Sequence, residues 1–378
     1  MKKVIIATWY GPANYGTALQ AVALKQYLEH IGYDVCFLDD RRSVNAGSEE
    51  KTPMTLMNRT MNRLIKFFKI VTWKKLPYKI DLKTKETLQN KYMDKYTPVV
   101  TIATDRDAER IGNEADIFVS GGDQIWNPYV TIPGFMLDFV PKGKNKISYG
   151  TSVGVKAIPS TYIETYKKYL VRYNAISVRE EQSATALQPI LNKHVDVVLD
   201  PTLLFSGEEW SFLMNDAVLD KEILKKPYIL AYFVGTRKDY WKYLSKIKKE
   251  TGDKVIVVPI NDQAYLNDFR KYVKVSPAEF LLLIKNAEII CTDSFHATVF
   301  SILFGKEFYT LKRFSDLNSK GQNGRLEYLL SKYGLSDRLI KDESHFERKG
   351  EIDYKQVFKV IEEERIISKQ WLKNAMEM

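Results

Sequence analysis

One stretch of the chain combines residues capable of acid–base chemistry with a position suited to an anion. Residues 288–305 form an apolar run, a polar turn with Asp293 and Ser294, and a second apolar segment that begins at His296. An apolar strand that enters a helix through a polar turn places that turn at the carboxyl edge of a parallel sheet, where open α/β folds bind ligands. The helix start adds unpaired N–H groups and partial positive charge. We predict His296 as an acid or base here; the alternative is an ordinary helix cap beside a packed histidine.

A second polar cluster follows the strand-like residues 115–119. Two glycines allow close approach of a backbone, and the next five positions crowd together a carboxylate, two amides and an indole. An aromatic face packs on the C–H groups of a sugar while amides bind its hydroxyls, so this composition favours a glycan ligand over a purely structural loop. The predicted acceptor-binding residues are Asp123, Gln124, Trp126 and Asn127.

Arg179 lies directly after another strand-like run, residues 175–178. A guanidinium at the end of a strand can hold a phosphate or a carboxylate with two parallel hydrogen bonds. The alternative is a salt bridge to one of the nearby carboxylates, Glu180, Glu181 or Asp123.

The loop 11–16 follows the apolar strand 4–9 and precedes an amphipathic helix. Its glycines do not have the GxGxxG spacing of a dinucleotide fingerprint. We expect the helix start to face a ligand, with Asn14 and Tyr15 in contact with it; the alternative is a turn that only connects two elements.

The alternation of strands and helices in both halves predicts an α/β protein with two doubly wound, Rossmann-like domains that face each other across a cleft. We place the N-terminal, acceptor-side domain at residues 1–200 and the C-terminal, donor-side domain at 201–345. The remaining segment, 346–378, contains a long amphipathic helix that we expect to pack back on the N-terminal domain.

Residues 41–111 form a predicted basic insertion without a clear sheet signal. Within it, 56–70 has the pattern of an amphipathic helix with a basic polar side. Such a helix can cap the sheet with its charges in water, or it can lie on an anionic membrane surface.

Composition limits the classes of function. The 378 residues carry a formal net charge of +10, which favours anionic partners, and the 45% hydrophobic content supports large cores. The two cysteines, Cys36 and Cys291, lie in apolar runs, so buried free thiols and a cytoplasmic location are expected. No signal peptide, membrane-spanning run or metal-binding spacing is visible. Nucleic acid is the weakest partner class, because the basic residues are not interleaved with aromatic ones.

Five segments in the same order resemble the polysaccharide pyruvyl transferase family, and together they extend over about residues 3–340. These segments are NYGTALQAVAL (14–24), DIFVSGGDQIWNP (116–128), ISVREEQS (176–183), LDPTLL (199–204) and TDSFHATVFSILFGKEF (292–308).

The resemblance implies a fold similar to the GT-B glycosyltransferases and phosphoenolpyruvate as donor, whose pyruvyl group becomes a ketal on two sugar hydroxyls. It also implies a donor site built from an arginine that matches Arg179 and a histidine that matches His296. Many members carry an arginine two residues before this histidine, where the present chain has Ser294. Either Arg313, Arg325 or the helix start replaces that cation, or the donor differs.

With this resemblance the predicted site has two groups besides the acceptor residues. The catalytic group consists of His296, Arg179 and Asp293, in which Asp293 fixes the imidazole tautomer. The donor-binding group consists of Ser294, Phe295, Arg179, Arg313, Arg325, Asn14, Tyr15 and Gly16.

The scheme requires no metal and no cofactor, and phosphoenolpyruvate is a co-substrate. The expected acceptor is a glycan or a lipid-linked sugar. A lipid-linked acceptor is compatible with contact between the protein and the inner face of the membrane. Two other functions remain: a glycosyltransferase of the same architecture that uses a nucleotide sugar, and a non-catalytic glycan-binding protein.

Overall fold

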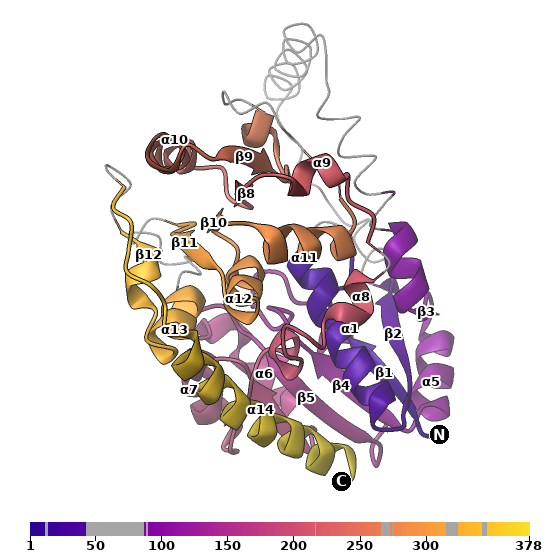
Figure 1. Cartoon of the computed structure of the whole chain (residues 1–378). Coiled ribbons are helices and arrows are strands. Elements are labelled where there is room, and N and C mark those ends of the chain that lie inside the picture. Colours follow the sequence, from indigo (N-terminus) through magenta and orange to yellow (C-terminus); the bar gives the residue numbers. More distant parts are fainter. Residues whose placement is uncertain are drawn as a thin grey trace, which may run out of the picture.

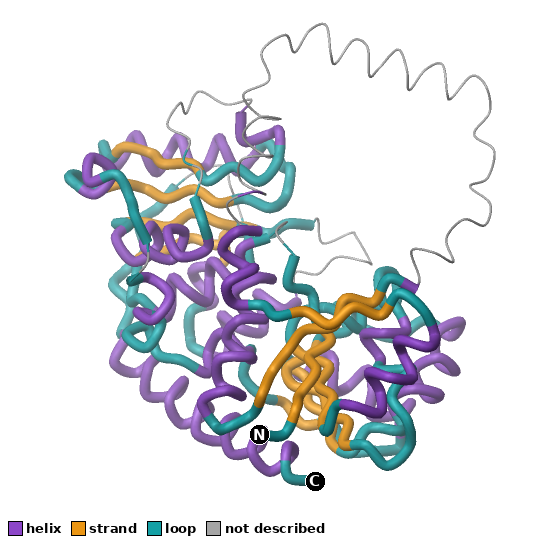
Figure 2. The backbone as a smooth tube through the Cα atoms, turned by 90° about the vertical axis from the view of Figure 1, so that its right-hand side faces the viewer, coloured by secondary structure: helices purple, strands orange, loops and turns teal. Residues whose placement is uncertain are grey.

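The chain folds into two parallel sheets, each with helices on both faces (Figure 1). The structure is a computed structural model that describes residues 1–11, 14–42, 87, 90–215, 217–265, 273, 275–314, 324–341 and 346–378. In Figure 2 the strands of the two sheets form separate groups with helices between them. The predicted architecture of two α/β domains is therefore confirmed.

The N-terminal sheet has seven parallel strands in the order β3-β2-β1-β4-β5-β6-β7. Chain order reverses on either side of β1 and β4, which is the point where doubly wound sheets open a crevice for ligands. The strands are β1 (Lys3–Ala7), β2 (Asp34–Asp40), β3 (Val99–Ile102), β4 (Ile117–Gly121), β5 (Asn145–Thr151), β6 (Ala175–Val178) and β7 (Asp196–Val197).

The C-terminal sheet has five parallel strands in the order β12-β11-β10-β8-β9. The strand β10, which leads into the predicted turn at 292–295, lies in the middle. Its strands are β8 (Tyr228–Tyr232), β9 (Lys254–Val257), β10 (Ile289–Thr292), β11 (Glu307–Leu311) and β12 (Leu339–Ile340). All four residues of β10 are buried, as a central strand between two helical layers requires.

Helices cover both faces of each sheet, and their apolar sides build the cores. On the N-terminal sheet α1 and α14 share one face, while α5, α6 and α7 cover the other. The helices are α1 (Tyr15–His30), α5 (Asp105–Glu114), α6 (Ser160–Leu170), α7 (Glu181–Leu191), α8 (Ser211–Met214), α9 (Lys221–Leu224), α10 (Asp239–Thr251), α11 (Pro277–Asn286), α12 (Phe295–Leu303), α13 (Gly324–Lys332) and α14 (Tyr354–Met376), with short 3-10 turns η1 (Pro133–Met136), η2 (Pro201–Leu204), η3 (Asp262–Tyr265) and η4 (Ser336–Arg338).

Helix α1 lies between the two domains. One side, with Tyr15 and Leu19, belongs to the core of the C-terminal domain together with α11 and α12. The other side, with Leu24 and Leu28, packs on β1 of the N-terminal sheet. Because both sides of α1 are buried, its apolar residues lie on nearly all sides of the helix. Its amino end lies between the two sheets.

The C-terminal helix α14 returns from the C-terminal domain to the N-terminal sheet, along the lower left of Figure 1. Leu372, Ala375 and Met376 pack in the same core as β1 and α1. The side-chain amide of Asn145 donates to the carbonyl of Ala375 at 3.0 Å, and the hydroxyl of Ser368 accepts the N–H of Leu199 at 3.0 Å. The helix thus connects the two domains a second time.

One part of the predicted insertion 41–111 belongs to the sheet. Residues 99–102 form the edge strand β3 and α5 starts at Asp105 with Thr104 as its cap, so the expectation of no strand there is corrected. The predicted helix 56–70 lies outside the described residues. Cys36 and Cys291 are buried and free, as predicted. Among the described helices none is both long enough and apolar enough to cross a membrane.

Replacement of Leu372 by alanine tests the docking of α14. The side chain is fully buried, so its truncation is expected to lower the free energy of unfolding by about 2–5 kcal/mol. Ile366→Ala on the same helix is the control, since Ile366 is 61% exposed and its loss should change stability by about 0.5 kcal/mol or less. Urea unfolding followed by circular dichroism measures both; equal losses would show that α14 is not docked through Leu372.

Candidate active site

The strand–turn–helix at 288–305 forms as predicted, from β10 into α12. Ser294 is the cap of α12, with its hydroxyl accepting from the N–H of Ala297 at 3.4 Å. His296 follows in the first turn and is 4% exposed. Its ring lies against α1 at Gly16, where an added Cβ would come within 2.3 Å of the imidazole Nδ1. Only glycine at this position lets the histidine of one domain rest on the helix of the other.

Arg179 lies at the end of β6 and is surrounded by three carboxylates. Its Nη1 is 2.6 Å from Asp200 Oδ2, its Nη2 is 3.2 Å from Asp123 Oδ1, and its Nε is 3.4 Å from Glu180 Oε2. Burial alone would lower the pKa of Arg179, but these carboxylates outweigh it and raise that pKa. The salt-bridge alternative is therefore realised with Asp123 and Glu180, and Asp200 is an additional partner.

Asp200 joins the two domains at the centre of the site. The oxygen that contacts Arg179 is also 3.6 Å from Nε2 of His296. The other oxygen accepts the N–H of Thr202 at 3.0 Å, so the carboxylate caps η2 and is held in place. Burial would raise the pKa of Asp200, but His296 and Arg179 lower it well below the usual range. Asp200 was not among the predicted site residues, although the motif LDPTLL, in which an aspartate follows a strand, was a signal for it.

Asp123 is the third member of this cluster, and its backbone is strained. It is a non-glycine residue with φ of 51°, which the surrounding contacts must hold. Its carboxylate accepts the hydroxyl of Thr17 at 2.8 Å and lies 3.9 Å from Nη1 of Arg325. Burial opposes ionisation, but Arg179 and the other cations lower the pKa of Asp123.

Phe295 holds the two guanidinium groups of the site. Its ring centre is 4.6 Å from Cζ of Arg179 and 5.7 Å from Cζ of Arg325, both cation–π distances. Burial and the neighbouring Arg179 lower the pKa of Arg325 to about 9. The charged form of Arg325 is thus destabilised by its buried position, and an anion bound beside it would be stabilised by that charge.

Asp293 and Arg313 form a separate pair. Asp293 accepts the N–H groups of Val234 and Gly235, each at 2.7 Å, and Nε of Arg313 lies 3.1 Å from the same carboxylate. The predicted bond from Asp293 to the imidazole is corrected: neighbouring residues on a helix start point apart, and the carboxylate nearest His296 is Asp200. Asp293 thus fixes the loop after β8, and Arg313 pairs with Asp293 while its charge contributes to the lowered pKa of Arg325.

The amino end of α1 supports the site through packing. Asn14 is the cap of α1, where its Oδ1 accepts from Gly16 N at 3.0 Å and from the hydroxyl of Tyr232 at 3.2 Å. Tyr15 is fully buried, stacks on Phe280 with ring centres 4.5 Å apart and donates to the carbonyl of Val275. Tyr15 was predicted to contact the donor substrate. This prediction is corrected, because its side chain packs between the two domains.

The acceptor cluster divides into buried and available groups. Trp126 is fully buried and its indole N–H donates to the carbonyl of Phe135, so the ring has no face open to a sugar and its predicted stacking role is corrected. Asn127 accepts the N–H of Tyr129 in its own turn. Gln124 is 6% exposed and its amide nitrogen has no hydrogen-bond partner among the described residues, which leaves a donor for a ligand.

A small cavity lies at the junction of the cluster. Its volume is about 20 Å³, and it is bordered by Arg179, Asp200, Phe295 and Arg325. This space holds about one water molecule. A larger ligand therefore needs the domains or α13 to move apart.

The sequence matches the family model of polysaccharide pyruvyl transferase over residues 14–313, which includes every residue of the cluster except Arg325. The chain belongs to the polysaccharide pyruvyl transferase family. No curated protein matches it.

Solved structures that resemble this polysaccharide pyruvyl transferase family member include three with low sequence identity. UDP-GlcNAc 2-epimerase from Methanocaldococcus jannaschii is 14% identical over 96% of this chain and 92% of that one, with a TM-score of 0.48. The Neisseria meningitidis UDP-GlcNAc 2-epimerase bound to UDP-GlcNAc is 11% identical over 98% and 93%, with a TM-score of 0.45. UGT89C1 from Arabidopsis thaliana is 11% identical over 99% and 94%, with a TM-score of 0.47.

A change of Asp200 to asparagine in this family member tests the cluster. Loss of one partner from a buried ion pair is expected to lower the free energy of unfolding at neutral pH by about 3–5 kcal/mol. The pKa of Asp200 is lowered by folding, so its stabilisation is present above the unfolded value, near about 4, and is lost as pH falls below it. The variant should therefore lose less stability than the parent between about pH 5 and pH 2.

Chemical denaturation at a series of pH values measures both effects. Asp94→Asn is the control, because that side chain is exposed and its replacement should change stability at neutral pH by about 0.5 kcal/mol or less. Parallel pH profiles for the parent and Asp200→Asn would rule out an ionised, stabilising Asp200.

Proposed function

We propose that this protein transfers the pyruvyl group of phosphoenolpyruvate to two hydroxyls of a sugar, as a ketal, in the synthesis of a cell-surface polysaccharide. Membership of a transferase family supports this activity. The observation that carries it is the shared contact at Asp200, since a guanidinium from one domain and an imidazole from the other approach a single carboxylate oxygen. A substrate bound beside this contact would meet groups from both domains.

Charge indicates where the donor binds. Three carboxylates, Asp123, Glu180 and Asp200, already surround Arg179, so an incoming anion competes for that guanidinium. Arg325 has the opposite character: burial, and after it the neighbouring Arg179, lower its pKa, so an anion beside it would stabilise the charged form. We assign the donor phosphate or carboxylate to Arg325, beside Phe295 and the amino end of α12. Arg325 then replaces the family arginine whose position is taken by Ser294.

The reaction is balanced without an oxidant or a reductant. A proton adds to the methylene carbon of phosphoenolpyruvate, which becomes the methyl group of the ketal. One acceptor hydroxyl bonds to C2, the C2–O bond to phosphate breaks with its electron pair on phosphate, and the second hydroxyl bonds to C2. Of the two protons lost by the hydroxyls, one replaces the proton given to carbon and one leaves on hydrogen phosphate.

His296 is the residue suited to move these protons. Imidazole exchanges protons near neutral pH, and the buried Nε2 of His296 has no hydrogen-bond partner among the described residues. The lowered pKa values of Asp200 and Asp123 make them weak bases. Their part in the scheme is to orient the imidazole, the guanidinium and the acceptor hydroxyls, with Gln124 as a further donor to the acceptor.

Release of phosphate tests the function directly. The protein is incubated with phosphoenolpyruvate and a set of glycosides, and both inorganic phosphate and the ketal product are measured. His296→Gln should lower kcat by about 10²–10⁴-fold, the usual contribution of a general acid. His194→Gln is the control, since that side chain is 77% exposed. Full phosphate release by His296→Gln would remove His296 from the chemistry.

Other outcomes would contradict the proposal as a whole. Tight binding of a UDP- or GDP-sugar with no turnover of phosphoenolpyruvate would identify a glycosyltransferase. Glycan binding with no change in any donor would identify a non-catalytic protein.

Two arginine variants test the assignment of the donor to Arg325. Arg325→Met should raise the KM for phosphoenolpyruvate about tenfold or more, because a buried cation that faces the anion is lost, and Arg325→Lys should recover part of the effect. Arg313→Met is the comparison, since Arg313 pairs with Asp293 and lies outside the Arg179 cluster. It should lower thermal stability with a smaller change in KM. A larger KM effect from Arg313→Met would assign the donor to the other pair.

A further inference from the structure

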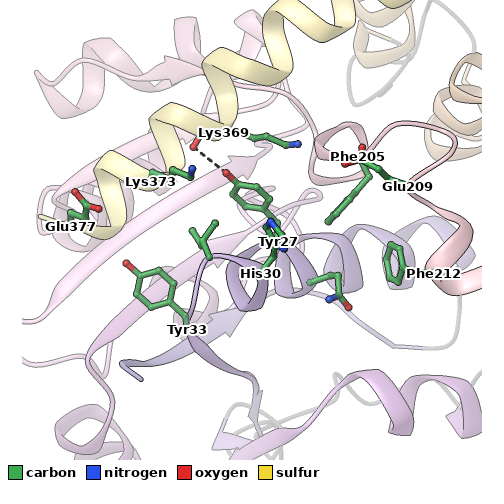
Figure 3. A pocket seen from close by; sticks show the side chains of 11 residues that line it. Tyr27, His30, Tyr33, Phe205, Glu209, Phe212, Lys369, Lys373 and Glu377 are labelled. Carbon is green, nitrogen blue, oxygen red and sulfur yellow. Dashed lines mark hydrogen bonds between the residues drawn. The ribbon is translucent and has the colours of Figure 1, made fainter.

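A large hollow lies away from the donor site, between the carboxyl end of α1 and the last turns of α14 (Figure 3). Its volume is about 840 Å³, within the usual range for ligand sites. The amino end of α1 touches His296, and the hollow lies at the opposite end of the same helix, which with 16 residues is about 24 Å long. A ligand here is separate from the donor.

The walls of this hollow combine aromatic rings with polar side chains. The rings come from α1, from the residue Tyr33 before β2 and from the segment that crosses between the domains: Tyr27, Tyr33, Phe205 and Phe212. Tyr27 is only 4% exposed and has Lys369 over its ring, so the rings that can meet a ligand are the partly exposed Tyr33, Phe205 and Phe212. Aromatic faces beside hydrogen-bonding groups are the surface on which sugar rings pack.

The hollow is lined by two lysines and two carboxylates, so its own charges nearly balance. Lys369 and Lys373 lie along α14, and within the described part of the chain neither has a carboxylate at ion-pair distance. Burial opposes ionisation of Glu209, but the N–H of Ser206 at 2.6 Å and the nearby Lys369 lower its pKa, so Glu209 offsets part of the charge of that lysine. Glu377 lies at the far end, beyond Lys373 in Figure 3.

A second hollow continues this pattern along the first half of α14. It measures about 580 Å³ and has an apolar floor that includes Leu303 and Phe358. Three lysines, Lys285, Lys355 and Lys359, border it and form no ion pair in the regions that the structure describes. Its lining also contains Glu208 and the ion pair of Arg365 with Glu362, so this hollow keeps an excess of positive charge. The two hollows are both lined by α14, whose 23 residues extend over about 35 Å.

We propose that these two hollows bind an acidic oligosaccharide, the carboxylate-bearing part of the polysaccharide chain. The lysines match its charge and the rings match its sugar faces. A flat bilayer fits a recess between helices less well than a chain does. The identity of the acid rests on the proposed function, because each ketal adds one carboxylate to the glycan. The groove then holds sugars that are already modified while the donor site acts on another part of the chain.

Binding of defined oligosaccharides tests this proposal. The probes are hexagalacturonate, which carries carboxylates, and maltohexaose, which is neutral and equally long, each titrated into the full chain by calorimetry at two salt concentrations. Hexagalacturonate should bind more tightly than maltohexaose and weaken with salt. Lys369→Glu with Lys373→Glu should weaken it about tenfold or more, and Lys373→Glu alone should weaken it to a smaller degree.

A matched control variant reverses the charge of two lysines outside the two hollows. Lys167→Glu with Lys168→Glu on α6 changes the net charge equally and should leave the affinity unchanged, while melting temperatures verify folding. Equal binding of both oligosaccharides, no binding of either, or no loss in the Lys369/Lys373 variant would overturn the proposal. Stronger binding of phosphatidylglycerol vesicles or of an acidic peptide would overturn it in favour of that partner.

The same variants separate this proposal from the proposed function. His296→Gln should bind hexagalacturonate as the parent does while losing phosphate release. Retained phosphate release without oligosaccharide binding would contradict the groove alone, and the reverse would contradict the pyruvyl transfer alone.

Discussion

A single carboxylate oxygen, Oδ2 of Asp200, is the constraint on which the site depends. It is the point where Arg179 of the N-terminal sheet and His296 of the C-terminal sheet come within ion-pair distance. Asp200 itself belongs to the connection that leaves the first sheet and is fixed there by its cap on η2. The site therefore exists only when both domains are docked, and its geometry reports their relative position.

The docking is achieved by packing around α1. Because one side of this helix belongs to each core, the two sheets cannot separate widely without exposing apolar surface at Tyr15 or Leu24. Gly16 on the same helix leaves room for His296, so the element that binds the domains together also positions the imidazole. A movement that enlarges the cavity is therefore expected on the far side of the site, at Arg325 on α13, and not at the α1 contact.

The sequence predicted those features that depend on local pattern. The polar turn at 292–295 could be placed at a sheet edge because a buried strand and an apolar helix flank it. The partners of that turn could not be predicted, since Asp200 reaches His296 only through the approach of two domains. Trp126 shows the opposite error: the residue types of a sugar site also serve a core, and burial decides between them. The strand β3 was missed because it is short and only its last residue, Ile102, is buried, unlike β9, whose last three residues are buried.

The cation in this part of the cluster comes from α13 and not from position 294. An arginine at position 294 would add a cation to the start of α12, but serine there satisfies the backbone of the helix instead. The guanidinium of Arg325, on α13, lies over the ring of Phe295. Its Nη1 is 3.9 Å from Oδ1 of Asp123. A buried cation costs free energy unless an anion compensates it, and the lowered pKa of Arg325 shows that the carboxylates present do so only in part. Burial is the largest cause of this lowered pKa, so an anion beside Arg325 would offset the cost of its charge.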